Sequence, residues 1–380
     1  MRILIITLFL SLNVAVNAQQ NYFPDAEWET KPAAALGFSK SLLDSAVQFA
    51  LTNENKLERD LRIANLKSYA REPDYKILGP MKPRGGPAGM VIKNGYIVAQ
   101  WGDVQRVDMT FSVTKSYLAV VAGLAVDAGL IKNEKEKVAQ YVWDDQFEGN
   151  HNASVTWQQL LTQSSDWSGG LFGLQDWADR PPKEGSINDW KNRKLLTPGT
   201  NFEYNDVRVN LLAYSLLHVW RKPLPAVLKE KIMDPIGAST TWRWFGYDDA
   251  FINIDGIMMQ SVSGGGHHGG GIFINTQDQA RLGLLFLRNG KWKMQQLLSQ
   301  NWINATRQPS VANKNYGYLW WLNTEQGWQG VSANVYYAAG YGGNYIIVDQ
   351  EHDIVVVTRW MDDSKIAELM RKVIAAAKSN

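Results

Sequence analysis

The stretch "TFSVTKSYLAVVAGLAVDAGLI", positions 110–131, carries Lys115 three residues after Ser112 and at the head of a long apolar run. No other charged residue lies at positions 109–126. An apolar run of this length predicts a buried helix. A spacing of three residues places the serine and the lysine on one helical face, where the amine can reach the hydroxyl.

The Ser112–Lys115 pair suits nucleophilic catalysis. Desolvation disfavours the charged form of a lysine and lowers its pKa, so a buried amine can act as a general base. A serine at a helix N-terminus also lies beside free backbone N–H groups that can stabilise an oxyanion. The alternative is accidental spacing, with a surface lysine in the first helical turn, because about one Ser-x-x-Lys is expected by chance in such a chain.

The first residues have the pattern of a secretory signal peptide. Arg2 precedes an apolar run over residues 3–12, and small residues precede a predicted cut after Ala18. The apolar run is shorter than a membrane-spanning helix. We therefore expect a periplasmic or secreted protein without a membrane anchor. The predicted organisation is a signal peptide over 1–18, a linker or arm over 19–36, and one domain over 37–380.

Composition excludes several classes of function. The chain has no cysteine, which rules out a thiol nucleophile and cysteine-ligated zinc. Its 39 basic residues nearly balance its 37 acidic ones, so no electrostatic footprint for nucleic acid is present. Sixteen tryptophans make an indole-lined groove for an organic substrate plausible. The oligomeric state stays open.

The order of the expected elements indicates an α+β fold. The N- and C-terminal parts are expected to form one antiparallel sheet flanked by helices, with an inserted, mainly helical subdomain over roughly 116–260. Asn94-Gly95 predicts a type I′ turn within a hairpin. A long segment over 164–199 is expected to be a packed loop rimming a site. Helices are predicted over 38–51, 207–220, 278–290 and the C-terminal residues from 366, and strands over 345–348 and 354–360.

The motif "FSVTK" resembles the nucleophile motif of the serine β-lactamase and penicillin-binding protein superfamily. The nearest pattern is its class C-like branch, which includes esterases and 6-aminohexanoate-dimer hydrolases. The resemblance covers about residues 37–378 and implies a β-lactamase-like fold. Further matches follow in family order: "LLTQSS" (160–165), "PGTNFEYND" (198–206), "DPIGAST" (234–240), "GGGHHGGGIFINTQDQARLGLL" (264–285) and "YYAAGYGGNYIIVDQEHDIVVV" (336–357).

The resemblance assigns roles to individual residues. Ser112 would be the nucleophile, Lys115 the base, and Tyr204 the group that shares a proton with Lys115 and passes it to the leaving group. The family's Tyr-x-Asn motif reads Tyr-x-Asp here, which places a carboxylate at Asp206. If Asp206 lies near Lys115, it raises the lysine pKa against desolvation. Alternatively, it points into solvent or caps the helix that begins near Val207.

The third family motif falls on Ala338, Ala339 and Gly340. By resemblance, the N–H of Tyr341 would be the second oxyanion donor, beside that of Ser112. Relatives that act on β-lactams or D-alanyl peptides have a lysine or histidine at the first position, where it helps to hold a substrate carboxylate. Alanine at this position disfavours such substrates.

The resemblance therefore implies a serine hydrolase that forms an acyl-enzyme on carboxylic esters or small amides, without a cofactor. One alternative is a β-lactamase or D-alanyl-D-alanine carboxypeptidase in which another basic side chain replaces the missing cation. A second is a non-catalytic descendant that binds cell-wall fragments or a partner. The pair His267 and His268 lacks the spacing of a metal-ligand set, so we expect no metal.

Overall fold

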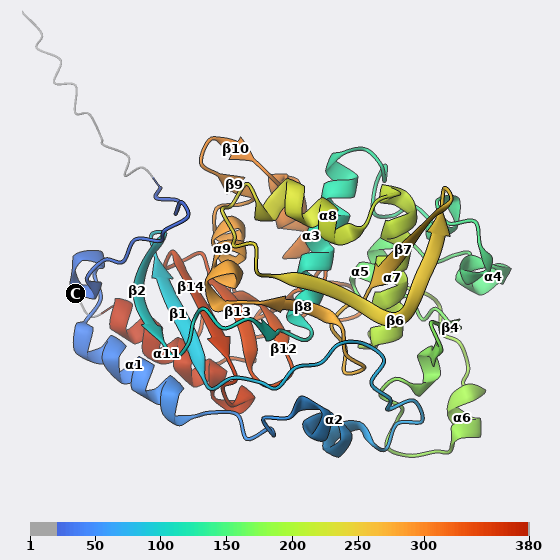
Figure 1. Cartoon of the computed structure of the whole chain (residues 1–380), viewed down its shortest axis with the longest axis horizontal. Helices are drawn as coiled ribbons and strands as arrows, with labels where there is room; N and C mark the ends of the chain where they lie inside the picture. Colours follow the sequence, from blue (N-terminus) through green and yellow to red (C-terminus); the bar gives the residue numbers. More distant parts are fainter. Residues whose placement is uncertain (1–20, 379–380) are drawn as a thin grey trace, which may run out of the picture.

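The computed structural model describes residues 21–378, and the predicted signal peptide lies outside them. Its main sheet is antiparallel and six-stranded, in the order β11-β12-β13-β14-β1-β2. Strands from the two ends of the described chain therefore lie side by side, which confirms the predicted sheet (Figure 1). The strands are β1 (Ala88–Lys93), β2 (Tyr96–Trp101), β11 (Trp321–Leu322), β12 (Tyr336–Gly340), β13 (Asn344–Asp349) and β14 (Ile354–Arg359).

Helices cover both faces of this sheet. On one face, α1 (Lys40–Thr52) packs against α11 (Ile366–Ala377), as Figure 1 shows. On the other face, α9 (Thr276–Leu287) packs against β13, β14 and β1. The apolar face predicted for the last helix is buried: it consists of Ile366, Leu369, Met370, Val373 and Ile374.

The β1–β2 hairpin has the predicted turn. Asn94 and Gly95 both have positive φ, at 53° and 89°. A type I′ turn needs this backbone at both central positions, and its twist matches that of the flanking strands. The hairpin fixes the register of β1, which pairs on its other side with β14.

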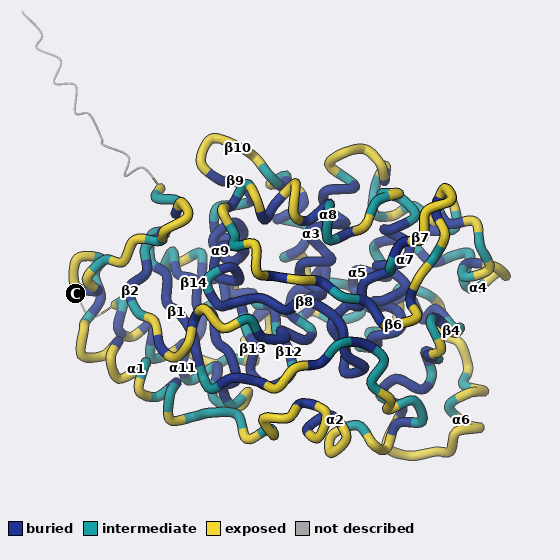
Figure 2. Tube along the Cα trace, viewed as in Figure 1, coloured by how far each residue is buried: buried dark blue, intermediate teal, exposed yellow. Residues whose placement is uncertain are grey.

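The helical part is built around α3 (Val113–Asp127), which is buried from Val113 to Ala125. It packs against α7 (Asp206–Trp220), another buried helix. In Figure 2 the interior that contains these helices is almost wholly dark blue. The shorter helices are α2 (Leu61–Tyr69), α4 (Gly149–Asn152), α5 (Trp157–Leu161), α6 (Ile187–Lys191), α8 (Leu224–Leu228) and α10 (Gln300–Thr306).

A second sheet, which the sequence analysis does not predict, has the order β3-β8-β6-β7. Its strands are β3 (Asp108–Met109), β6 (Arg243–Ile254), β7 (Ile257–Val262) and β8 (Gly271–Ile274). Most of β6 and β7 lies in the stretch expected to be mainly helical. The register of β6 against β7 shifts between Gly246 and Phe251, and this irregularity interrupts the alternation by which a strand is recognised.

The segment 164–199 contains β4 (Gly170–Leu171), β5 (Leu174–Gln175) and α6, with long irregular stretches between them. Its first half is largely buried and includes Trp167, Asp176 and Asp179, whereas residues 183–196 are largely exposed. The remaining strands, β9 (Lys291–Trp292) and β10 (Gln295–Gln296), form a short hairpin. Across residues 21–378, every helix is too short or too polar to cross a bilayer.

Arg359, at the end of β14, joins the two sheets. It is buried and donates hydrogen bonds to Asn344 Oδ1 (2.7 Å), to the Ile274 carbonyl in β8 (2.8 Å) and to the Met109 carbonyl in β3 (2.9 Å). Burial lowers the pKa of Arg359 to about 10. These bonds connect β3, the strand that leads into Ser112, to the main sheet.

We predict that Arg359→Met destabilises the fold by about 3 kcal/mol or more, because it leaves buried acceptors without a donor. Urea unfolding followed by tryptophan fluorescence measures the effect. Arg371→Met is the matched control, since Arg371 is exposed and, within residues 21–378, its side chain donates a hydrogen bond to the Gln329 carbonyl alone. Equal losses of unfolding free energy in the two variants would show that the connection between the sheets contributes little.

Candidate active site

Ser112 sits at a sharp turn between β3 and α3. Phe111, just before it, has φ of 48°, a left-handed conformation that is costly for a bulky residue. Ser112 is the N-cap residue of α3, but its side chain does not cap the helix. The hydroxyl instead accepts a hydrogen bond from Lys115 Nζ at 2.8 Å. The helical spacing therefore produces the contact expected of a nucleophile and its base.

Lys115 is not a surface lysine, since its side chain is only 1% exposed. Besides Ser112, its ammonium contacts the Gly264 carbonyl at 3.2 Å and Asp206 Oδ1 at 2.7 Å. Burial lowers the pKa of Lys115, but Asp206 and Tyr204 raise it by more, so the pKa lies above its ordinary value. The two opposing effects expected on the Lys115 pKa are thus both present, and the increase caused by the carboxylate exceeds the decrease caused by desolvation.

Asp206 is the first residue of α7, and it neither caps the helix nor faces solvent. The cap is Asn205, whose side chain accepts from the Arg208 N–H at 3.1 Å. The Asp206 side chain is 1% exposed and points to Lys115. Gly266 makes this possible, because a Cβ there would lie 2.3 Å from Asp206 Oδ2. The glycine-rich loop therefore packs directly against the acidic group.

A shell of charges surrounds Asp206. Arg180 donates to Asp206 Oδ2 at 2.7 Å and to Asp179 Oδ1 at 2.9 Å. His267 Nδ1 lies 3.3 Å from Asp206 Oδ2. Burial alone would raise the pKa of Asp206, but Arg180, Lys115 and His267 outweigh burial and hold it well below its usual range. Asp206 is therefore a carboxylate shared among three cations.

His267 connects this shell to a second carboxylate. Its Nε2 lies 2.7 Å from Glu72 Oε2, and its ring stacks on Tyr69 with centroids 4.0 Å apart. Burial lowers the pKa of His267, but hydrogen bonds to Asp206 and Glu72 raise it to about 9. The ring is therefore a cation at neutral pH, with a carboxylate at each nitrogen.

Four side chains of this region have the chemistry of metal ligands. Ligand atoms of Glu72, Asp179, His267 and His268 all lie within 4.8 Å of one another. The ligand atoms of three of these residues already have partners, however. Arg180 donates to both oxygens of Asp179, and His267 pairs with Glu72. A divalent cation would compete with the Arg180 guanidinium beside it. The absence of a metal remains a prediction, which chelator treatment would test.

Tyr204 lies beside this centre with its ring half-buried. Lys115 Nζ is 5.1 Å from the ring centroid, and the ring stacks on Trp321 at 5.9 Å. Within residues 21–378 the Tyr204 hydroxyl forms no hydrogen bond. The structure therefore brings the tyrosine to the site but leaves its hydroxyl free, and catalytic hydrogen bonds often tighten only when substrate binds.

Strand β12 closes the site on the other side. Its partner β11 pairs only with Tyr336 and Tyr337, so the outer edge of residues 338–340 is open. A Cβ on Gly340 would lie 2.2 Å from the Thr110 carbonyl and 3.2 Å from the Ser112 nitrogen. Only glycine permits this close approach, which brings the start of the Tyr341 turn next to the Ser112 amide.

The cleft above Ser112 has a volume of about 430 Å³. The predicted indole lining is only partly right, because most of the rings are phenols. Two charged side chains, Arg180 and Asp363, also line the cleft. Its aromatic residues are Tyr69, Tyr204, Trp321, Tyr337, Tyr341 and Tyr345.

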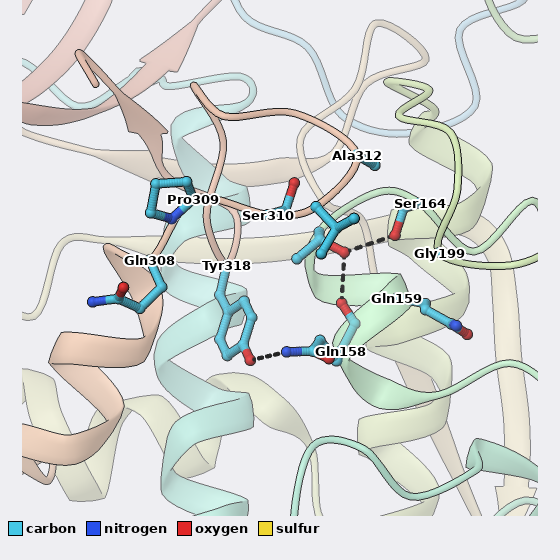
Figure 3. Close-up of a pocket in the computed structure, with 11 residues that line it drawn as sticks. Gln158, Gln159, Ser164, Gly199, Gln308, Pro309, Ser310, Ala312 and Tyr318 are labelled. Atoms are coloured by element: carbon cyan, nitrogen blue, oxygen red, sulfur yellow. Dashed lines mark hydrogen bonds between the residues drawn. The ribbon is translucent and has the colours of Figure 1, made fainter. Parts of the chain in front are cut away.

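A second cavity, of about 170 Å³, has no titratable side chain other than the Tyr318 phenol (Figure 3). Figure 3 shows Gln158 donating to the Tyr318 hydroxyl. The hydroxyls of Thr162 and Ser164 are hydrogen-bonded to each other at 2.8 Å. None of the predicted site residues lines this cavity. With neither a nucleophile–base pair nor a charge, it offers no chemistry comparable to that at Ser112.

Sequence reasoning missed Arg180, Asp179 and Glu72, and gave His267 no role beside Asp206. Arg180 lies in the irregular segment 164–199 with φ of 50°, where no periodicity points to it. The sequence pointed to Arg180 only indirectly: if Asp206 is buried beside Lys115, its second oxygen needs a further cation. Glu72 follows α2, more than 100 residues before its partners, and carries no local motif.

Comparison with known proteins agrees with this geometry. The model of the β-lactamase family matches residues 84–376, whereas no curated protein matches the chain. A family VIII carboxylesterase shares the fold at 16% identity and a TM-score of 0.56, over 87% of this chain and 97% of that one. EstCE1, a hydrolase with promiscuous acyltransferase activity, has 14% sequence identity and a TM-score of 0.58, over 89% of this chain and 98% of that one. A candidate 6-aminohexanoate-dimer hydrolase from Bacillus anthracis has 16% sequence identity and a TM-score of 0.56, over 76% of this chain and 78% of that one.

At these identities the solved structures show the fold alone, which is the predicted α+β, β-lactamase-like one. The family match covers most of the chain, including every predicted site residue. The resemblance inferred from the motifs is thereby confirmed, and the chain belongs to the β-lactamase family.

Proposed function

We propose that this protein is an exported serine hydrolase that cleaves carboxylic esters or small amides through an acyl-enzyme. The observation that carries the proposal is the buried contact of Lys115 with the Ser112 hydroxyl beneath an open cleft. Export rests on the N-terminal sequence pattern. A lysine held in the interior next to a serine has no evident use in a binding module.

The proposed reaction begins with proton transfer from Ser112 Oγ to the free amine of Lys115 as Oγ attacks the substrate carbonyl. The N–H groups of Ser112 and Tyr341 would stabilise the oxyanion, since Gly340 brings their backbones together. Collapse breaks the bond to the leaving group, which takes a proton from the Tyr204 hydroxyl. Tyr204 is reprotonated from Lys115, and water then hydrolyses the acyl-enzyme.

The charges of the cleft favour substrates that need no carboxylate anchor. Ala338 provides no cation on β12. Arg180, the basic residue that lines the cleft, is bonded to Asp179 and Asp206. It is therefore poorly placed to replace the missing basic residue, as the alternative of a β-lactamase or D-alanyl-D-alanine carboxypeptidase would require.

The nucleophile is tested with a fluorophosphonate probe. We predict that the probe modifies Ser112 and that Ser112→Ala abolishes both labelling and ester turnover, because the hydroxyl is the attacking group. Peptide mapping by mass spectrometry locates the label. A label on another residue would refute the assignment, and a folded wild-type protein that is neither labelled nor active would favour the non-catalytic alternative.

Substrate preference is tested by comparing short p-nitrophenyl esters with nitrocefin. We predict a kcat/KM at least about tenfold higher for the best ester, since discrimination follows contacts made in the transition state. Steady-state kinetics at one pH gives both values. A nitrocefin value equal to or above that of the best ester would favour the β-lactamase alternative.

The role of Asp206 is tested through the pH profile of kcat/KM. Asp206 raises the pKa of Lys115, so the free amine appears only at alkaline pH. Asp206→Asn removes this effect and should move the acidic limb to lower pH by about one unit or more. Arg180 opposes Asp206, so Arg180→Gln should move the limb to higher pH.

Arg180→Lys retains the charge and serves as the control for Arg180→Gln. Circular dichroism must first show that each variant is folded. An unmoved limb in a folded, active Asp206→Asn enzyme would remove Asp206 from the catalytic set.

A further inference from the structure

Only one of the two charged side chains lining the cleft is available to a substrate. Arg180 is bonded to Asp179 and Asp206, as described above. Asp363, the first residue of a short 3₁₀ helix after β14 (Asp363–Lys365), also lines the cleft and is exposed. The accessible charged group of this cleft is therefore an anion, whereas a site that binds a carboxylate would present a cation.

Asp363 has neutral partners only. Its Oδ2 accepts from Asn55 Nδ2 at 3.1 Å, and its Oδ1 accepts from the Tyr345 hydroxyl at 3.3 Å. Among the described residues 21–378, it takes part in no ion pair. These two bonds hold the carboxylate at the wall of the cleft without neutralising it.

The other charges around the cleft balance one another. Three cationic groups, on Lys115, Arg180 and protonated His267, contact the carboxylates of Asp206, Asp179 and Glu72. Asp363 is outside this network, because none of its partners belongs to it. Burial raises the pKa of Asp363 and the Tyr345 hydrogen bond lowers it, so its ionised form is favoured by the tyrosine. When ionised, Asp363 is a charge of the cleft wall without an ion-pair partner among residues 21–378, and an incoming substrate meets it there.

Two neighbouring tyrosine rings, Tyr337 and Tyr345, line the cleft, and Trp328 stacks on one face of Tyr337 with centroids 4.1 Å apart. Tyr345, which bonds to Asp363, has its ring 5.8 Å from that of Tyr337. Both tyrosines line the cleft, and Tyr345 pairs with Ala339 of β12. Aromatic faces attract ammonium groups, and a nearby carboxylate adds a full charge to this attraction. The set of groups thus matches a cation that carries alkyl substituents.

We propose that Asp363, Tyr337 and Tyr345 form a subsite for an ammonium group of the substrate, so that the enzyme prefers cationic esters or amides to neutral ones. This inference rests on the proposed hydrolase function and names the substrate class of the same cleft. With Ala338 in place of a basic residue, the cleft lacks a cation for a carboxylate, and Asp363 presents an anion that repels one.

The test compares esters with their carbon isosteres, which differ only in charge. p-Nitrophenyl 6-(trimethylammonio)hexanoate is paired with p-nitrophenyl 7,7-dimethyloctanoate, so that the charge is on the acyl side. Acetylthiocholine is paired with S-(3,3-dimethylbutyl) thioacetate, so that it is on the leaving group. We expect the cationic member of one pair to have about a fivefold to twentyfold higher kcat/KM, in line with a partly exposed charge pair assisted by aromatic faces.

The variants assign this preference to Asp363. Asp363→Asn keeps the shape and the hydrogen-bonding capacity, and the ratio of the preferred pair should fall to about 1. Asp362→Asn is the matched control, because it removes a neighbouring charge that does not line the cleft, and it should keep the wild-type ratio. Fluorophosphonate labelling of Ser112 verifies that each variant is folded, independently of ester turnover.

The outcomes separate the two proposals. Neutral esters turned over without a cationic preference in either pair would overturn the subsite and leave the hydrolase intact. A preference that persists in Asp363→Asn would also overturn it. No turnover of any ester by a folded wild-type enzyme would refute the hydrolase function itself. A preference that also falls as salt rises from 0.02 to 0.5 M would agree with an exposed charge pair.

Discussion

The ion pair between Lys115 and Asp206 is the constraint around which the site is arranged. Both side chains are almost completely buried, and each charge would be very costly without the other. Asp206 has two oxygens, and the second must be satisfied too, which is the role of Arg180 and His267. These cations in turn require Asp179 and Glu72. One buried lysine thus accounts for a chain of charges that extends to Glu72, which follows α2, and to the segment 164–199.

The same pair sets the chemistry that Lys115 can perform. A lysine surrounded only by apolar groups would lose its proton readily and be a ready base at neutral pH. Asp206 keeps the proton on the amine, while Arg180 and His267 weaken the carboxylate's hold. The strength of the base is therefore determined by residues that do not touch Ser112. For this reason the family motif alone, which ends at Asp206, does not determine the pH at which Lys115 can act as a base.

The predictable parts of this molecule are those encoded locally. The Ser112–Lys115 contact follows from helical spacing, and the Asn94-Gly95 turn follows from the backbone that it requires. The roles of Tyr204 and Gly340 came from the family pattern, and the structure places both residues at the cleft. Arg180 and His267, the other partners of Asp206, were not predictable, because they come from loops far apart in the chain. The β6–β7 pair was missed since an irregular register hides its alternation.

Asp363 is a cleft residue that no sequence motif predicted. The sequence motif at Ala338 shows that the basic residue of the family motif is missing, which disfavours carboxylate-bearing substrates without naming another class. Asp363 lies 25 residues later, in a short 3₁₀ helix, and reaches the cleft after the chain has passed through β13 and β14, the strands that follow β12 in the sheet. Its partners, Asn55 and Tyr345, are neutral, so its charge is not consumed by the fold. A carboxylate that lines the same cleft as the Ser112 hydroxyl and, among residues 21–378, takes part in no ion pair is better explained by a cationic ligand than by stability.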